Sequence, residues 1–135
     1  MQTFGQFSLL EKLIERVNSK DWWHVPPSDK SSYSKKGKFY SSTFKEAEFY
    51  GRPNDKPEKV LVHNPLVGDG ETIGKTLGIP PQYAGMNYEE ISSQDVLWKN
   101  AAMKMGYDSI IHMSPQGFSA YQLGKIPISI ELNVF

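Results

Sequence analysis

The sequence predicts an α+β fold. Helical and strand-like patterns follow one another without the regular strand–helix–strand alternation that builds a doubly wound sheet. Apolar residues recur at helical spacing over 7–19 and 92–105, whereas apolar and polar residues alternate over 127–135, as in a half-buried strand. A chain of 135 residues has the size of one domain, and we expect that domain to span residues 1–135.

Composition narrows the classes of function. The 15 basic and 15 acidic residues leave no net charge to draw the chain to nucleic acid or an anionic membrane. The absence of cysteine excludes disulfides, thiolate catalysis and cysteine-based zinc sites. His63 and His112 show no metal-ligand spacing, so no metal site is expected. Because there is neither a membrane-length apolar run nor a secretion signal, we expect an intracellular, cytoplasmic protein that does not enter a membrane.

The N-terminal part predicts a helix, a strand and a loop. The helix is expected over 7–19, with Ser8 as its N-cap. Residues 21–25 are a short aromatic run that ends at two prolines and predict a strand that carries His24. Residues 26–37 are polar and contain proline, serine and glycine, which predicts a surface loop.

The segment 38–51 predicts a strand that runs directly into a short helix. Its strand ends in aromatic residues, and Thr43 and Glu46 have the spacing of a capping box. A Gly-Arg-Pro sequence then stops the helix. This corner presents Tyr40 at the strand end and Tyr50 at the helix end, and two such rings can form the walls of a slot for a flat ligand.

The middle of the chain predicts a strand, a glycine-rich stretch and a helix. Residues 59–63 have the composition of a strand that ends at an Asn-Pro pair. Residues 68–90 contain glycines without the spacing of a dinucleotide-binding or phosphate-binding loop, so we expect a functional loop or two short helical turns. The helix over 92–105 should end at Gly106.

The C-terminal part predicts three strands. The first follows the glycine stop, over 107–111, and the second, over 118–123, follows a turn. The third covers 127–135 and has the clearest alternation in the chain. Its apolar residues share one face, so Glu131 projects from the polar face.

These motifs resemble those of the ADP-ribosyltransferases, most closely the diphtheria-toxin-like group. The Phe-Tyr-Ser-Ser corner with its Tyr-Gly helix end, the Gly-Tyr-Asp strand and the late glutamate carry the resemblance, which spans residues 20–135. The resemblance implies the split β-sheet core of that family with short peripheral helices. It also implies NAD as the substrate.

The resemblance assigns roles to individual residues. Catalysis falls to Glu131 and His24. The residues that it assigns to NAD binding are His24, Tyr40, Ser41, Ser42 and Tyr50. Tyrosine rings can stack on the cationic nicotinamide, with a cation–π contribution of about 0.5–2 kcal/mol. A carboxylate can stabilise the oxocarbenium-like ribose that forms when the glycosidic bond breaks.

The implied function is mono-ADP-ribosylation of a macromolecule, with protein as the expected acceptor, as in a phage or bacterial effector or toxin. Two alternatives stay open: a catalytically inactive domain of this family that binds a partner protein, and a small interaction domain of another α+β fold. A second alignment of the motifs would place the glutamate near 116–119, where the chain has none. The domain would then bind without catalysis, or would use Gln116 or Gln122 in a weaker role.

Each assignment also has a purely structural alternative. His24 can be a half-buried strand histidine, Tyr40 a core residue and Glu131 a solvated strand residue. Four lysines form a local basic patch that is either a solvated face or a contact for a phosphate or an acidic partner. These lysines are Lys30, Lys35, Lys36 and Lys38.

Overall fold

A four-stranded mixed sheet forms the centre of the computed structural model, which describes residues 4–135 of the chain and the side chains of residues 9–135. The strands, in chain order, are β1 (Lys38–Ser41), β2 (Pro65–Gly68), β3 (Ser109–His112) and β4 (Glu131–Val134). Their spatial order is β1-β4-β3-β2. β4 pairs antiparallel with both of its neighbours, whereas β2 and β3 are parallel. The α+β class is therefore confirmed, whereas the ADP-ribosyltransferase-like core stays a prediction.

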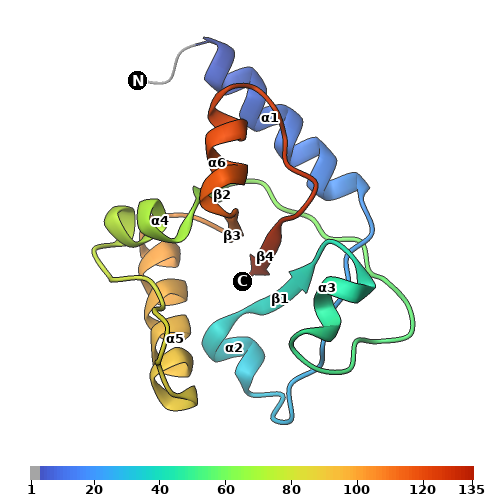
Figure 1. Ribbon diagram of the computed structural model, residues 1–135, viewed down its shortest axis with the longest axis vertical. Coiled ribbons are helices and arrows are strands. Elements are labelled where there is room, and N and C mark those ends of the chain that lie inside the picture. The colour runs from blue at the N-terminus through green and yellow to red at the C-terminus, as the bar shows by residue number, and fades with distance from the viewer. Residues whose placement is uncertain (1–3) are drawn as a thin grey trace.

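Helices lie on both sides of this sheet (Figure 1). They are α1 (Phe4–Ser19), α2 (Ser32–Lys36), α3 (Phe44–Glu48), α4 (Gly70–Leu77), α5 (Tyr88–Lys104) and α6 (Pro115–Gln122). α1 and α6 contribute to the larger hydrophobic cluster, together with residues of β1, β3 and β4. α4 and α5 form a smaller cluster with residues of β2 and β3.

The pairing register decides which strand residues face which cluster. Paired residues on adjacent strands share a face, because side chains alternate along each strand. Tyr40 and Ile111 both pair with Leu132 and belong to the larger cluster. Ser41 and His112 both pair with Glu131 and therefore face the opposite side, where α4 and α5 lie.

The N-terminal elements differ from the sequence prediction in three places. The first helix begins at Phe4, so Ser8 lies inside it and is not its N-cap. The expected strand over 21–25 is reduced to two isolated bridges, in which Trp22 pairs with Glu58 and Trp23 with Ser41. The expected loop over 26–37 contains the short helix α2.

The expected strand over 59–63 is wrong. This segment is extended but pairs with no strand among the described residues, and β2 begins only at Pro65. Side chains satisfy its backbone donors instead: Asn18 accepts from the N–H of Val62 at 2.8 Å, and Asp108 accepts from the N–H of His63 at 2.7 Å. Pro65 fits the first strand position because it has no N–H to contribute to the ladder.

The expected strand over 118–123 is also wrong, because this segment belongs to α6. The Ser-Pro-Gln-Gly sequence is a helix start rather than a turn: the hydroxyl of Ser114 accepts from the N–H of Gly117 at 3.0 Å, and Pro115 occupies the first turn. Such a cap satisfies one of the free donors at the N-terminus of the helix.

Three other predictions need new boundaries. Within 68–90 the chain forms one eight-residue helix, α4, capped by Asp69, and then enters α5. α5 starts at Tyr88, where Asn87 and Glu90 form a capping box, and not near residue 92. The last strand is shorter than 127–135 and begins at Glu131.

The corner between β1 and α3 is confirmed. Thr43 accepts from the N–H of Glu46 at 3.1 Å, as expected of an N-cap, and its hydroxyl donates to the Glu46 carboxylate at 3.0 Å. The short helix therefore turns the chain away from the sheet and brings Tyr50 back toward β4.

Candidate functional site

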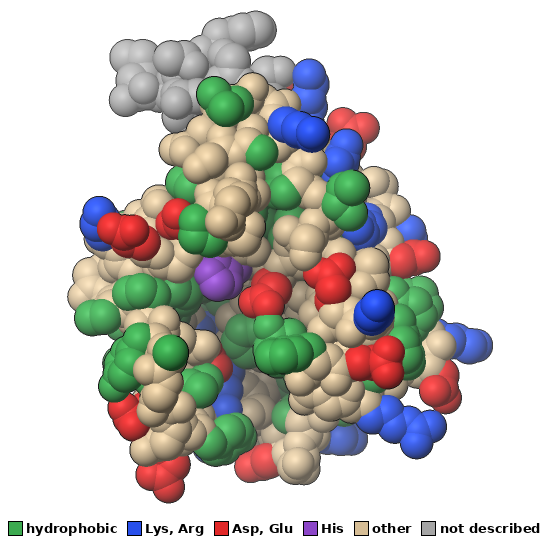
Figure 2. Space-filling view, in the orientation of Figure 1, with side chains coloured by type: hydrophobic (Ala, Val, Ile, Leu, Met, Phe, Trp, Pro, Cys, Tyr) green, Lys and Arg blue, Asp and Glu red, His purple; other side chains and the backbone are tan. Residues whose placement is uncertain are grey.

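A cavity of about 640 Å³ lies beside the sheet, on the side of α4 and α5. Its borders come from β1, β3, β4, α3 and α5, together with the segment that follows Trp23. The space-filling view shows this face hollowed near its middle, with acidic and hydrophobic side chains and a histidine around the hollow and basic side chains visible within it (Figure 2). A cavity of this size suits a ligand as large as a nucleoside.

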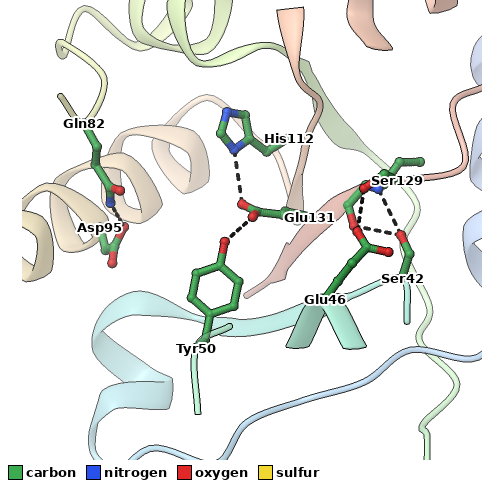
Figure 3. A network of polar contacts seen from close by, with 9 residues as sticks. Ser42, Glu46, Tyr50, Gln82, Asp95, His112, Ser129 and Glu131 are labelled. Atoms are coloured by element: carbon green, nitrogen blue, oxygen red, sulfur yellow. Dashed lines mark hydrogen bonds and ion pairs between the residues drawn. The ribbon is translucent and has the colours of Figure 1, made fainter. Parts of the chain in front are cut away.

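Glu131 lies at the centre of a polar network on the cavity wall. The hydroxyl of Tyr50 donates a hydrogen bond to Oε1 of Glu131, and Nδ1 of His112 lies 3.5 Å from Oε2. Figure 3 shows the two side chains pointing toward the carboxylate from different sides. The network joins residues from β4, β3 and the segment after α3, so it forms only in the folded chain.

This network holds Glu131 in its ionised form. The contact with His112 is the largest cause that lowers the pKa of Glu131, and the hydrogen bond from Tyr50 lowers it further, although burial acts in the opposite direction. Burial and the bond to Glu131 raise the pKa of Tyr50, so its hydroxyl stays protonated as a donor. A negative charge is therefore present at this place at neutral pH.

A second contact fixes where β4 begins. The buried hydroxyl of Ser42 donates to the carbonyl of Ile130 at 3.0 Å and accepts from the N–H of the same residue at 2.9 Å. This pair of bonds joins the β1–α3 corner to the residue before Glu131. Ser42 therefore acts on the site through the backbone and does not border the cavity.

Four of the predicted site residues border the cavity: Tyr40, Ser41, Tyr50 and Glu131. Tyr40 belongs to the strand that borders the cavity, but its side chain is only 7% exposed and belongs to the larger hydrophobic cluster on the opposite face. Its hydroxyl donates to Glu58 at 3.4 Å. Tyr40 points to the side of the sheet opposite to the cavity, because side chains alternate along β1. The two tyrosine rings therefore do not face each other across one slot, since Tyr50 borders the cavity.

His24 does not reach the large cavity. It is 4% exposed, and its Nδ1 donates to the carbonyl of Phe39 at 2.6 Å. A carbonyl only accepts, so Nε2 is left to accept the hydroxyl proton of Tyr33 at 2.9 Å. Burial lowers the pKa of His24, which favours this neutral form. The ring borders a smaller adjacent cavity of about 180 Å³.

Asp95 and His112 are site residues that sequence reasoning missed. Asp95 borders the cavity from α5, and burial, with a smaller contribution from the charge of Glu131, raises the pKa of its carboxyl group to about 6. Its helical spacing from Ile91 and Trp98, four residues before and three after, marks it as a carboxylate on a half-buried helix face. His112 could be identified as a site residue only from the pairing of β3 with β4, in which it lies opposite Glu131. No sequence motif relates the two residues.

The two glutamines that the alternative alignment of the motifs would assign to the site do not reach the cavity. Gln116 and Gln122 are exposed on α6 and do not border the cavity. Among the predicted basic patch, Lys38 forms an ion pair with Glu58 at 2.8 Å, and Lys36 lies 5.5 Å from the centre of the Tyr88 ring.

Two kinds of feature are absent from the described part of the chain: a metal-binding cluster and a membrane-spanning helix. No group of three or more histidine, aspartate or glutamate side chains is placed to hold a metal ion within residues 4–135. In the same part of the chain, no helix combines the length and the apolar character that crossing a membrane requires.

Comparison of the chain with protein-family models, with curated proteins and with solved structures found no match.

Proposed function

We propose that the protein breaks the bond between nicotinamide and ribose in NAD and transfers the ADP-ribose to a macromolecule, with a protein as the expected acceptor. The observation that carries this proposal is the position of Glu131. It is an ionised carboxylate, held by Tyr50 and His112, on the wall of a cavity that can contain a nucleoside. It is also the residue to which the family resemblance assigns catalysis.

The chemistry needs negative charge beside the ribose. When the glycosidic bond breaks, its electron pair goes to the ring nitrogen, so the cationic ring leaves as neutral nicotinamide. The ribose then has oxocarbenium character, which the carboxylate of Glu131 stabilises more strongly than it stabilises the ground state. An oxygen or nitrogen atom of the acceptor bonds to the ribose C1′, and the proton of that atom passes to solvent.

The surroundings of Glu131 suit this role. The Tyr50 side chain is 58% exposed, so its ring is available to a flat ligand while its hydroxyl holds the carboxylate. Because both hydrogen-bonding neighbours come from rigidly joined elements, the charge is in place before the substrate arrives. Trp23 and Trp98 add further aromatic surface at the border of the cavity.

The test is release of nicotinamide from NAD by the purified protein and by Glu131→Gln. The amide keeps the size of the side chain and can still accept the bond from Tyr50, but it has no charge. We expect the rate to fall by about a hundredfold or more, because one electrostatic contact to a developing charge is worth roughly that much. Glu48→Gln, which removes an exposed carboxylate from α3, is the matched control and should keep the wild-type rate.

The outcomes separate catalysis from binding. If neither protein releases nicotinamide while NAD still raises the melting temperature of the wild type, the domain is a binding module and the enzymatic proposal fails. An equal rate in the wild type and in Glu131→Gln would also contradict it, because the charge would then have no role.

A further inference from the structure

Carboxylates outnumber basic side chains on the border of the cavity, where His112 is the basic residue. Among the described residues that border it, three are carboxylates, Asp29, Asp95 and Glu131, and none is a lysine or an arginine. Lys36 borders the smaller adjacent cavity, where its side chain lies over the Tyr88 ring. A phosphate inside the large cavity would therefore meet negative charge without a lysine or arginine to pair with, whereas a cation would meet favourable charge.

Asp95 and Glu131 lie on different walls of the cavity, as Figure 3 shows for the two carboxylates and their partners. Asp95 comes from α5, and Nε2 of Gln82 donates to its Oδ1 at 2.9 Å. Glu131 comes from β4 and is held by Tyr50. Each carboxylate is thus oriented by its own amide or hydroxyl donor, and both remain in reach of a ligand between them.

The two carboxylates are close enough to sense each other. The charge of Glu131 contributes to raising the pKa of Asp95, and the charge of Asp95 contributes to raising the pKa of Tyr50. Two like charges around a partly dry space repel each other, and a cation between them relieves that repulsion. Lys36, which borders the smaller cavity together with Asp95, lowers the pKa of Asp95 and offsets part of this repulsion. A cation between the two carboxylates would offset more of it.

Aromatic side chains supply part of the remaining surface. Trp23, Tyr50, Tyr88 and Trp98 border the cavity. Their faces attract a cation, and they also stack on a flat ring. Aromatic faces combined with carboxylates are the features by which proteins recognise flat organic cations, and they give no advantage to a neutral ring of the same shape.

We infer that the cavity takes a flat, monovalent organic cation without phosphate, with Asp95 and Glu131 as its two counter-charges. The inference rests on the proposed function for the identity of this cation, an N-ribosylated pyridinium. Only the nicotinamide riboside part of NAD then enters the cavity, and the diphosphate stays outside it. Asp95 becomes a binding residue of the site, although no motif in the sequence assigns it.

The test compares two probes that cannot lose a ribose: 1-methylnicotinamide, which is a cation, and nicotinamide, which is neutral. Calorimetric titration of the wild type should give an affinity for the cation at least about tenfold higher than for the neutral ring. Asp95→Asn should lose about tenfold or more of the affinity for the cation and little for nicotinamide. Glu89→Gln removes an exposed carboxylate from the same helix and should bind both probes as the wild type does.

A second measurement is the pH dependence of the affinity. The groups that face Asp95 are Gln82, Lys36 and Glu131, with Tyr50 beyond them. Since the pKa of Asp95 is about 6 and a bound cation favours its ionised form, the affinity for 1-methylnicotinamide should rise between pH 5 and pH 7. This rise should be absent for nicotinamide and absent in Asp95→Asn.

Equal affinity for the two probes, no binding of the cation, or an unchanged affinity in Asp95→Asn would overturn the inference. These results are independent of catalysis. Cation binding without any release of nicotinamide from NAD ends the glycosidic proposal and leaves the inference standing. Release of nicotinamide without preference for the cation has the opposite meaning.

Discussion

Asp95 is a residue whose burial lowers the stability of the folded protein at neutral pH. Burial is the largest cause that raises the pKa of this carboxyl group to about 6, from its ordinary value of 3.8. The folded state therefore disfavours the ionised form relative to the unfolded chain. A residue of this kind persists in a fold when a ligand compensates for the buried charge, which agrees with its place on the cavity wall.

Asp95→Asn should therefore stabilise the folded protein. The free energy of unfolding at pH 7 should rise by about 2–3 kcal/mol, because the variant no longer has to ionise a buried carboxyl group. The free-energy cost of ionising Asp95 in the folded state begins above the pKa of Asp95 in the unfolded chain and is fully present above about pH 6. The stability gained by Asp95→Asn should therefore fade as the pH falls toward 4. Urea unfolding at pH 4.5 and pH 7 measures both values. A loss of stability at pH 7 would mean that burial does not penalise the charge.

The hydrogen bond from Tyr50 to Glu131 leads to a second prediction for a single side chain. Tyr50→Phe keeps the ring and removes the donor to the carboxylate, so the pKa of Glu131 should rise. Under the proposed function, kcat/KM for nicotinamide release should fall by about 10- to 100-fold, and the acid limb of its pH profile should move to higher pH.

Tyr83→Phe is the matched control for this change. The Tyr83 hydroxyl also donates to a glutamate, Glu90, at 3.1 Å, but Tyr83 does not border the cavity. This variant should keep the wild-type rate and pH profile. If the two variants behave alike, the bond between Tyr50 and Glu131 has no part in catalysis.

At the scale of elements, the junction between the β1–α3 corner and β4 positions the site. Ser42 makes both of its hydrogen bonds to the backbone of Ile130, 88 residues away in the chain. The corner forms from local signals, namely aromatic strand residues and a threonine cap, whereas the last strand has its own alternation. The buried serine joins these two locally determined pieces.

Ser42→Ala should destabilise the protein because it leaves the buried N–H and carbonyl of Ile130 without this partner. We expect the free energy of unfolding to fall by about 1–3 kcal/mol. Nicotinamide release should fall as well, since Glu131 is the next residue of the chain. Guanidinium unfolding gives the first quantity. Ser119→Ala, at an exposed position of α6, should stay within about 0.5 kcal/mol of the wild type, and a similar small effect of Ser42→Ala would contradict the positioning role.

At the scale of the whole molecule, the cavity follows from how the helices cover the sheet. α1 and α6 pack on one face, whereas α4 and α5 build their hydrophobic cluster with β2 and β3 on the other (Figure 1). On that second face Ser41, Glu131 and Asn133 of β1 and β4 border the cavity instead of a helix. Polar residues can stand on this part of the sheet because no helix packs against it.

Much of the local structure could be predicted from the sequence. The α+β class, the capped corner at Thr43, the glycine stop at Gly106 and the outward direction of Glu131 all follow from patterns within a few residues. Two predicted strands, 59–63 and 118–123, were wrong for a shared reason. Short apolar segments do not reveal whether a strand, a side chain or the next helical turn will satisfy their backbone groups.

By itself, the sequence determined the β1–α3 corner, the two longest helices and the face of the last strand from which Glu131 projects, because capping and periodicity act over a few residues. Only the tertiary structure decided that Tyr40 enters the opposite core, and that His112 and Asp95 join the cavity. Pairing register and helix coverage depend on contacts between segments far apart in the chain, such as Ser41 and Glu131, which are 90 residues apart. Such contacts form where buried area and satisfied hydrogen bonds are greatest for the whole chain, and no local pattern contains that information.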